Sequence, residues 1–180
     1  MKDYQEDLYR IFGNYKRKNF LKAIFWSHYL FLYSWRKVKK GSRLSFVYKF
    51  FVKLIKSKNG LEIPYTVSIG KGFLIMHPYG ITINSHAKLG DNVTIYKGAT
   101  IGNIKCGEKK GAPEIGDNVY IGLNSTIVGK VNIGSDVLIA PNTFVNFDVP
   151  SHSIVIGSPG VIHMKQNATE GYINNPINYL

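Results

Sequence analysis

The sequence lacks the features that anchor or cross-link secreted proteins. It contains one cysteine, Cys106, so an internal disulfide framework is excluded and a reducing compartment is expected. We expect no secretory signal, because the apolar stretch from Phe20 to Trp35 begins far from the first residue and is interrupted by Lys22 and His28. The same stretch is too short and too polar for a transmembrane helix. These absences predict a cytoplasmic protein.

Patterns that bind metal ions or nucleic acids are also missing. No pair of the five histidines has metal-ligand spacing, and no cysteine pair exists, so we expect no metal site. Acidic residues are few, 11 against 23 lysines and arginines, and the formal net charge is +12. No nucleic-acid recognition module accompanies this charge, and we expect no nucleic-acid partner.

The positive charge is confined to the first third of the chain. Residues 1–60 contain 15 basic and three acidic residues, and 15 − 3 gives the whole excess of +12, whereas residues 61–180 carry eight of each sign. This change of composition predicts a domain boundary near Gly60. We expect a basic, aromatic-rich helical segment over 1–60, a main domain over 61–165 and an extended tail over 166–180.

The basic segment shows helical periodicity. Gly13 and the run Lys39-Lys40-Gly41 divide it into about three predicted helices. The third is the clearest, because apolar residues recur there at helical spacing with lysines between them. Two interpretations of this segment remain open. The helices cap the first coil of the following domain, or they also rest on anionic lipid at the inner face of the plasma membrane.

An aliphatic residue returns every six positions through most of the main domain. Such a period, with glycine or another small residue often following, is typical of a left-handed parallel β-helix in which each returning residue points into a narrow prism. Thirteen positions at three per coil predict about four coils. They are Ile63, Ile69, Ile75, Ile83, Leu89, Ile95, Ile101, Ile115, Ile121, Ile127, Ile133, Ile139 and Val145.

The period fails at two places, and both carry polar residues. The first is the eight-residue step from Ile75 to Ile83, which holds His77, and the second is the segment 103–114. A solenoid accepts insertions only as loops outside its core, and such loops commonly form the functional face. A histidine fits a general base, because its pKa lies near neutrality. A loop histidine without function has the same spacing, so both interpretations stay open at this point.

Short motifs surround these breaks and continue along the repeat. They are Glu62-Ile63-Pro64, Ile69-Gly70-Lys71-Gly72, His77-Pro78-Tyr79-Gly80-Ile81, Gly90-Asp91-Asn92-Val93, Thr100-Ile101-Gly102, Pro113-Glu114-Ile115-Gly116-Asp117-Asn118-Val119, Ile121-Gly122, Val149-Pro150 and Gly157-Ser158-Pro159. Together, over about residues 60–165, they resemble the serine acetyltransferase branch of the hexapeptide-repeat acyltransferases. The resemblance implies a left-handed β-helix that forms homotrimers, uses acetyl-CoA as co-substrate and places its active sites between subunits.

The same resemblance implies roles for individual residues. His77 falls on the general base, and Glu62 falls on the carboxylate that orients it, where the family more often has Asp. Lys165 is a weak substitute for a basic residue that meets the CoA phosphate. The positions expected to hold acetyl-CoA are Gly102, Gly122, Leu123, Ala140 and Pro141. Tyr79, Lys105 and Lys109 are expected to bind substrate, although simple solvation also explains a lysine-rich loop.

The sequence differs from the serine-specific enzymes at two places, and these differences favour an acceptor other than serine. Met76 stands where the serine enzymes have an acidic residue, and Gly111-Ala112-Pro113 stands where they have a second histidine. We therefore expect transfer to a sugar hydroxyl of a bacterial surface polysaccharide such as a capsule, with a glycan, nucleotide-sugar or lipid-linked sugar as acceptor. The alternatives are a serine or amino-sugar N-acetyltransferase and, from another class, a non-catalytic solenoid scaffold.

Overall fold

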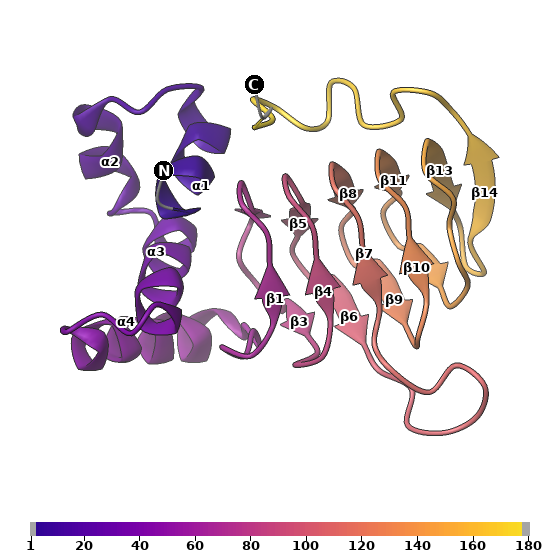
Figure 1. Ribbon diagram of the computed structural model, residues 1–180, viewed down its shortest axis with the longest axis horizontal. Helices are drawn as coiled ribbons and strands as arrows, with labels where there is room; N and C mark the ends of the chain where they lie inside the picture. The colour runs from indigo at the N-terminus through magenta and orange to yellow at the C-terminus, as the bar shows by residue number, and fades with distance from the viewer. Residues whose placement is uncertain (1–2, 178–180) are drawn as a thin grey trace.

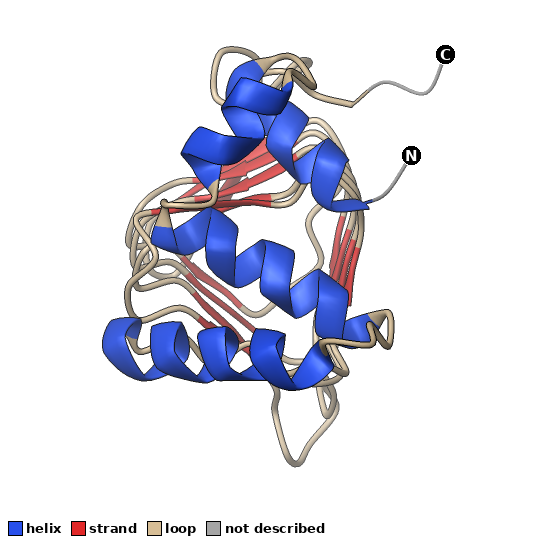
Figure 2. Cartoon of the chain, turned by 90° about the vertical axis from the view of Figure 1, so that its left-hand side faces the viewer, coloured by secondary structure: helices blue, strands red, loops and turns tan. Residues whose placement is uncertain are grey.

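The computed structural model describes residues 3–177, which form a helical cap at one end of a β-solenoid (Figure 1). Seen from that end, the helices lie in front of three sheets arranged as a triangle (Figure 2). None of the described helices is long and apolar enough to cross a membrane. The helices are α1 (Asp3–Phe12), α2 (Arg17–Ala23), α3 (Ser27–Lys39) and α4 (Ser45–Asn59).

The cap has four helices where the sequence predicted about three. The additional break lies between α2 and α3, where the backbone of Trp26 is extended with φ −87° and ψ 123°. The Trp26 ring stacks on Phe12 with centroids 5.4 Å apart and on His28 at 5.6 Å. The break between the helices therefore coincides with the packing of Trp26. It contains no glycine or proline, which are the residues that reveal a helix break in a sequence.

The solenoid confirms the predicted β-helix. Its strands form three parallel sheets, β1-β4-β7-β10, β2-β5-β8-β11-β13 and β3-β6-β9-β12, and β14 adds to β13 antiparallel. Twelve strands at three per coil make four complete coils, and bridges at Glu62 and Val149 extend the stack at both ends. The strands are β1 (Ser68–Ile69), β2 (Leu74–Met76), β3 (Thr82–Ile83), β4 (Lys88–Leu89), β5 (Thr94–Tyr96), β6 (Thr100–Gly102), β7 (Glu114–Ile115), β8 (Val119–Ile121), β9 (Thr126–Val128), β10 (Asn132–Ile133), β11 (Val137–Ile139), β12 (Phe144–Val145), β13 (Ser153–Ile156) and β14 (Val161–Met164).

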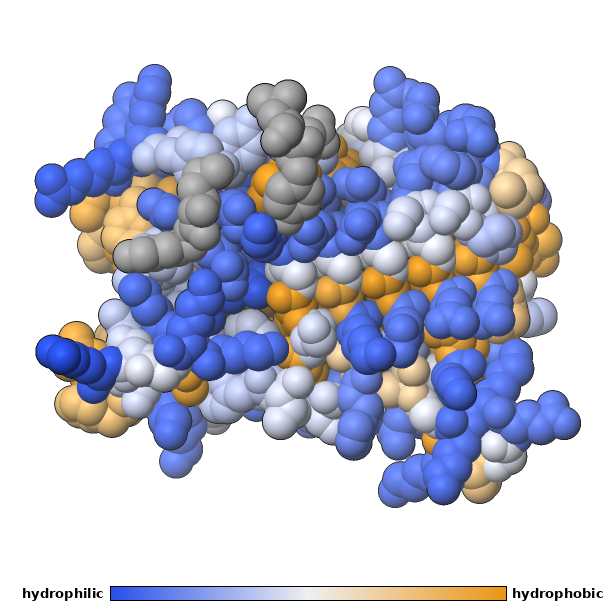
Figure 3. All heavy atoms as spheres, in the orientation of Figure 1, coloured by the Kyte–Doolittle hydropathy of each residue, from blue (hydrophilic) through white to orange (hydrophobic). Residues whose placement is uncertain are grey.

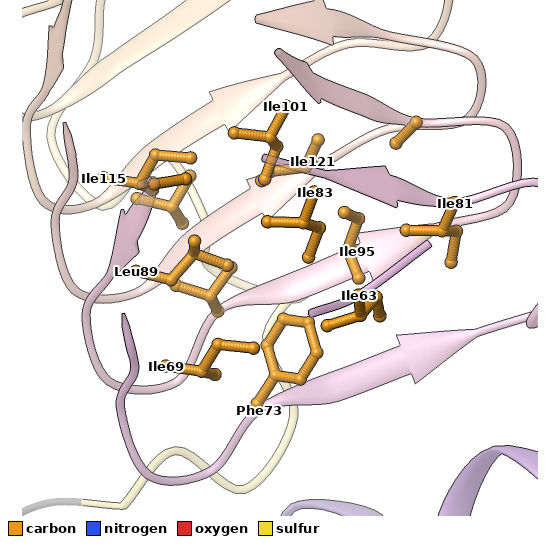
Figure 4. Packing of buried hydrophobic residues seen from close by; sticks show 14 of the residues in the cluster. Ile63, Ile69, Phe73, Ile81, Ile83, Leu89, Ile95, Ile101, Ile115 and Ile121 are labelled. Atoms are coloured by element: carbon orange, nitrogen blue, oxygen red, sulfur yellow. The ribbon is translucent and has the colours of Figure 1, made fainter. Parts of the chain in front are cut away.

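The six-residue period builds the core. Ile69 pairs with Leu89, and Ile95 with Ile121, so residues of the same position in the period stack from coil to coil. Figure 4 shows these side chains filling the interior of the first coils. Full burial of one such side chain contributes about 1.5–3 kcal/mol, so the repeat itself is the main source of solenoid stability.

A buried ion pair joins the cap to the first coil. Arg36 of α3 binds Asp7 of α1 through Nε and Nη2, at 3.0 and 3.1 Å, and its Nη1 donates to the carbonyl oxygen of Ile69 at 2.8 Å. Asp7 also accepts the backbone N–H of Phe73 at 3.0 Å. Burial raises the pKa of Asp7 to about 6, against the opposing effect of Arg36. Two helices and the first turn of the solenoid thus share one charged cluster.

The tail after β14 runs back over the solenoid toward the cap (Figure 1). Asp136 accepts hydrogen bonds from the Thr169 hydroxyl at 2.7 Å and from the Ala168 N–H at 3.0 Å. Farther along, the Ile177 N–H donates to the Asn92 side chain at 2.8 Å. Arg10 of α1 donates to the carbonyl oxygen of Asn174 at 2.8 Å. The tail therefore connects both ends of the molecule.

Candidate active site

His77 lies on one edge of the prism, formed by the turns that follow β2, β5, β8 and β11. We call it the His77 edge. The backbone of His77 has φ 53°, a left-handed conformation that is uncommon for residues other than glycine. Its turn is fixed from the next coil, because Lys97 N–H donates to the Met76 carbonyl at 3.1 Å and Gly98 N–H to Tyr79 at 2.8 Å. The imidazole is exposed while Pro78 behind it is buried.

A cavity of about 540 Å³ opens beside His77, between the first coil and the cap. Its lining includes Met76 and Pro78 from the solenoid, Trp26 and His28 from the cap, and Asn174 from the tail. Segments from both ends of the sequence therefore meet at the predicted general base.

His28 is a second histidine in this cavity, and the sequence analysis missed it. Burial lowers the pKa of His28, and the nearby His77 lowers it further, which keeps the His28 imidazole neutral near pH 7. Its ring stacks on Trp26. No spacing rule links position 28 to position 77, and the only signal was a polar residue interrupting an aromatic run.

Arg10 contributes a buried positive charge to the same cavity. Its Nη1 donates to the carbonyl oxygen of Gly72 at 2.7 Å, and its Nη2 donates to the Thr94 hydroxyl at 2.9 Å. With the bond to Asn174, three of the five guanidinium N–H groups have protein partners. Burial lowers the pKa of Arg10 to about 10, which still leaves it charged at neutral pH.

Glu62 lies at the start of the solenoid. It forms the first bridge of the solenoid with Thr82, its side chain is exposed, and it lines a different cavity together with Lys53 and Lys56 of α4. Within residues 3–177, no hydrogen bond or ion pair joins Glu62 to His77. The expected orienting role of Glu62 stays a prediction.

Four of the positions expected to hold acetyl-CoA lie on the His77 edge. Gly122 and Leu123 follow β8, and Ala140 and Pro141 follow β11, directly above them in the stack. A Cβ atom on Gly122 would lie 2.7 Å from the Ile139 carbonyl oxygen and from the Pro141 nitrogen, so only glycine fits there. With about 4.8 Å between neighbouring strands, these turns lie about 10 and 14 Å along the axis from His77.

The remaining predicted residues lie elsewhere, apart from Tyr79, which is exposed on the turn of His77. Gly102 ends β6 at the next edge, where the loop of residues 103–113 leaves the solenoid. Lys105 is exposed on that loop, and the Lys109 side chain binds the Asn146 carbonyl. Lys165 follows β14 and is exposed.

Among residues 3–177, no group of three or more His, Cys, Asp or Glu side chains is placed to hold a metal ion.

Known proteins resemble this chain in sequence and in structure. No protein-family model matches it. A serine acetyltransferase of Staphylococcus aureus (strain N315) is 38% identical over 139 residues, which cover 76% of this chain and 62% of that protein. The chain thus spans less than two thirds of the length of the curated relatives it matches. The Neisseria gonorrhoeae serine acetyltransferase, solved in complex with serine, superposes with a TM-score of 0.72 at 27% identity over 90% of this chain and 68% of that one.

A third comparison supports the fold alone. The serine acetyltransferase of Brucella abortus strain S19, solved in complex with coenzyme A, has a TM-score of 0.73 at 20% identity and covers 91% of this chain and 67% of that one. The stacked sheets match the left-handed β-helix fold of the hexapeptide-repeat acyltransferases. In sequence and fold, the chain is similar to the serine acetyltransferases of that class.

The expectation of a surface-polysaccharide acceptor was wrong. The similar proteins are serine acetyltransferases, and a solved relative holds serine itself. The expectation rested on Met76 and on Gly111-Ala112-Pro113, which replace groups of the serine enzymes. Local motifs could not show that the cap brings other polar groups, His28 and Arg10, to the cavity beside His77.

Proposed function

We propose that this protein transfers the acetyl group of acetyl-CoA to the hydroxyl of serine, with His77 as the general base. The observation that carries the proposal is the cavity beside His77, which is closed by cap residues and lies on the edge expected to bind acetyl-CoA. The names of the similar proteins support serine as the acceptor.

The reaction needs one base and no covalent enzyme intermediate. Neutral His77 takes the proton of the serine hydroxyl while the oxygen attacks the thioester carbonyl carbon. The tetrahedral intermediate collapses, the carbon–sulfur bond breaks, and the imidazolium returns its proton to the departing thiolate. The products are O-acetylserine and CoA with a free thiol. A positioned base of this kind contributes about 10²–10⁴-fold to the rate.

Arg10 and His28 are the groups we assign to serine recognition. The carboxylate of serine is attracted by the Arg10 guanidinium, which keeps two N–H groups beyond those bound to Asn174, Gly72 and Thr94. Neutral His28 offers a hydrogen-bonding ring nitrogen in the same cavity. Charge attraction and hydrogen bonding would then fix the orientation of the hydroxyl toward His77.

Acetyl-CoA is assigned to the groove along the His77 edge. An extended thiol-bearing arm lying past Ala140, Pro141, Gly122 and Leu123 would bring its acetyl end to His77. The close backbone contact at Gly122 keeps the turns tightly stacked and free of a protruding side chain at that point.

A homotrimer is part of the proposal. The His77 edge and the edge that carries Gly102, Lys105 and Lys109 are different edges of one prism. If both serve one active site, two subunits must supply them, and a closed ring of three is the assembly that the family resemblance implies.

Acceptor choice provides the test. The purified protein is incubated with acetyl-CoA and either L-serine or glucosamine, and release of the CoA thiol is measured. We expect release that depends on serine. Release only with glucosamine would replace serine by an amino sugar, and no release with either acceptor would favour the scaffold alternative.

A further inference from the structure

Helix α4 exposes an apolar stripe on the outer side of the cap. Phe46, Phe50 and Leu54 recur at four-residue spacing, so they lie on one face, and they are 72%, 63% and 53% exposed. Leu44, just before the helix, is also exposed. The opposite face, with Val52 and Ile55, is buried against the rest of the protein. Residues 3–177 thus leave this stripe uncovered.

Basic side chains border the stripe. At 100° per residue, Lys49 and Lys53 fall on one side of it and Lys58 on the other, and all three are exposed. Arg43 precedes the helix and is exposed as well. In Figure 2, α4 runs along the lower edge of the cap, and Figure 3 shows apolar beside strongly hydrophilic atoms in that region. An apolar face with a lysine-rich border is typical of helices that lie in a lipid interface.

We propose that α4 lies on an anionic lipid surface, with Phe46, Phe50 and Leu54 entering the interface and the bordering lysines contacting lipid phosphates. Charge favours this occupant over a second copy of the chain. Residues 1–60 carry the entire net charge of +12, so two such faces repel each other, whereas an anionic membrane attracts them. Residues 61–180 carry eight charges of each sign and add no comparable attraction.

Vesicle sedimentation tests the proposal with the full chain. We expect binding to vesicles of phosphatidylcholine with phosphatidylglycerol, weak binding to phosphatidylcholine alone, and loss of binding as salt is raised. Phe46→Ser/Phe50→Ser should release the protein from the anionic vesicles. Lys49→Glu/Lys53→Glu should weaken binding by at least about fivefold per lysine changed. These side chains are exposed, so the unfolding transition of each variant should match that of the parent protein.

A matched variant separates local from diffuse attraction. Lys88→Glu/Lys130→Glu makes the same change of net charge on the exposed surface of the solenoid, and it should bind anionic vesicles nearly as well as the parent protein. Equal loss in this control, or no vesicle binding by the parent protein, would overturn the proposal. A fall in solution mass caused by Phe46→Ser/Phe50→Ser would overturn it too, because another copy would then cover the stripe.

Discussion

At the scale of the residue, the backbone conformation fixes the position of His77, the proposed general base. His77 holds a left-handed conformation in a turn hydrogen-bonded to the next coil, so its exposed ring is positioned without being buried. The eight-residue step in the period allowed this residue to be predicted. His28 and Arg10 could not be predicted, because only folding brings α1 and α3 to the same cavity.

The coupling between the two histidines gives the first prediction. Burial and the proximity of His77 both lower the pKa of His28, so His77→Ala should raise the pKa of His28 toward its ordinary value. An NMR titration of the histidine ring protons across about pH 5–8 would measure the pKa of His28 in both proteins. Because folding lowers this pKa, His28 favours the folded state above pH 6.5, and that contribution is lost as the pH falls through the lowered value. An unchanged His28 titration in His77→Ala would contradict the shared cavity.

His28 also carries a kinetic prediction. If it binds serine, His28→Ala should raise the KM for serine about tenfold with a smaller effect on kcat, since the base remains in place. His163→Ala, on exposed β14, is the control and should change neither constant. A fall in kcat alone would assign His28 to the chemical step instead.

At the scale of the element, the solenoid was predictable and the cap was not. Each strand repeats one rule, an aliphatic residue pointing inward every sixth position, and thirteen repetitions identify the fold. The cap depends on single contacts such as Arg36 with Asp7, which lie 29 residues apart in sequence and follow no period. At the helix break near Trp26, the Trp26 ring stacks on Phe12, but no residue of the sequence indicated a break there.

The buried ion pair between Arg36 and Asp7 should contribute to the free energy of unfolding by holding the cap on the solenoid. Asp7→Ala leaves the buried Arg36 without a counter-charge and should lower the free energy of unfolding by about 3 kcal/mol. Asp3→Ala removes a carboxylate from the same helix, but its pair with Lys40 is exposed, so we expect a loss of about 0.5 kcal/mol. Urea unfolding of both variants measures the difference, and equal losses would show that the buried cluster does not dock the cap.

At the scale of the whole molecule, the two sets of predicted site residues lie on different edges. If His77 and the loop with Lys105 and Lys109 serve one active site, as proposed, neighbouring subunits must supply them. Short motifs predicted the fold but gave the acceptor wrongly. They could not predict the cavity beside His77, because it forms only where the cap and the tail meet the first coil.

Mixed assemblies test the shared site. His77→Ala subunits and Lys105→Glu/Lys109→Glu subunits should each be impaired alone. Refolded together in equal amounts, they should regain about one quarter of the active sites, because one neighbour supplies the histidine and the other the loop. Full activity of the lysine variant alone would remove the loop from the mechanism, and the absence of recovery would place each site within one subunit.

The central claim is that His77 removes the proton of serine. The most direct measurement compares serine-dependent release of the CoA thiol by the parent protein and by His77→Ala, with solution mass and acetyl-CoA affinity measured on the same samples. Since His77 is exposed on a turn outside the core, the account predicts unchanged mass and affinity. It also predicts a turnover lower by about 10²–10⁴-fold. A His77→Ala protein that retains near-normal turnover with serine would contradict it.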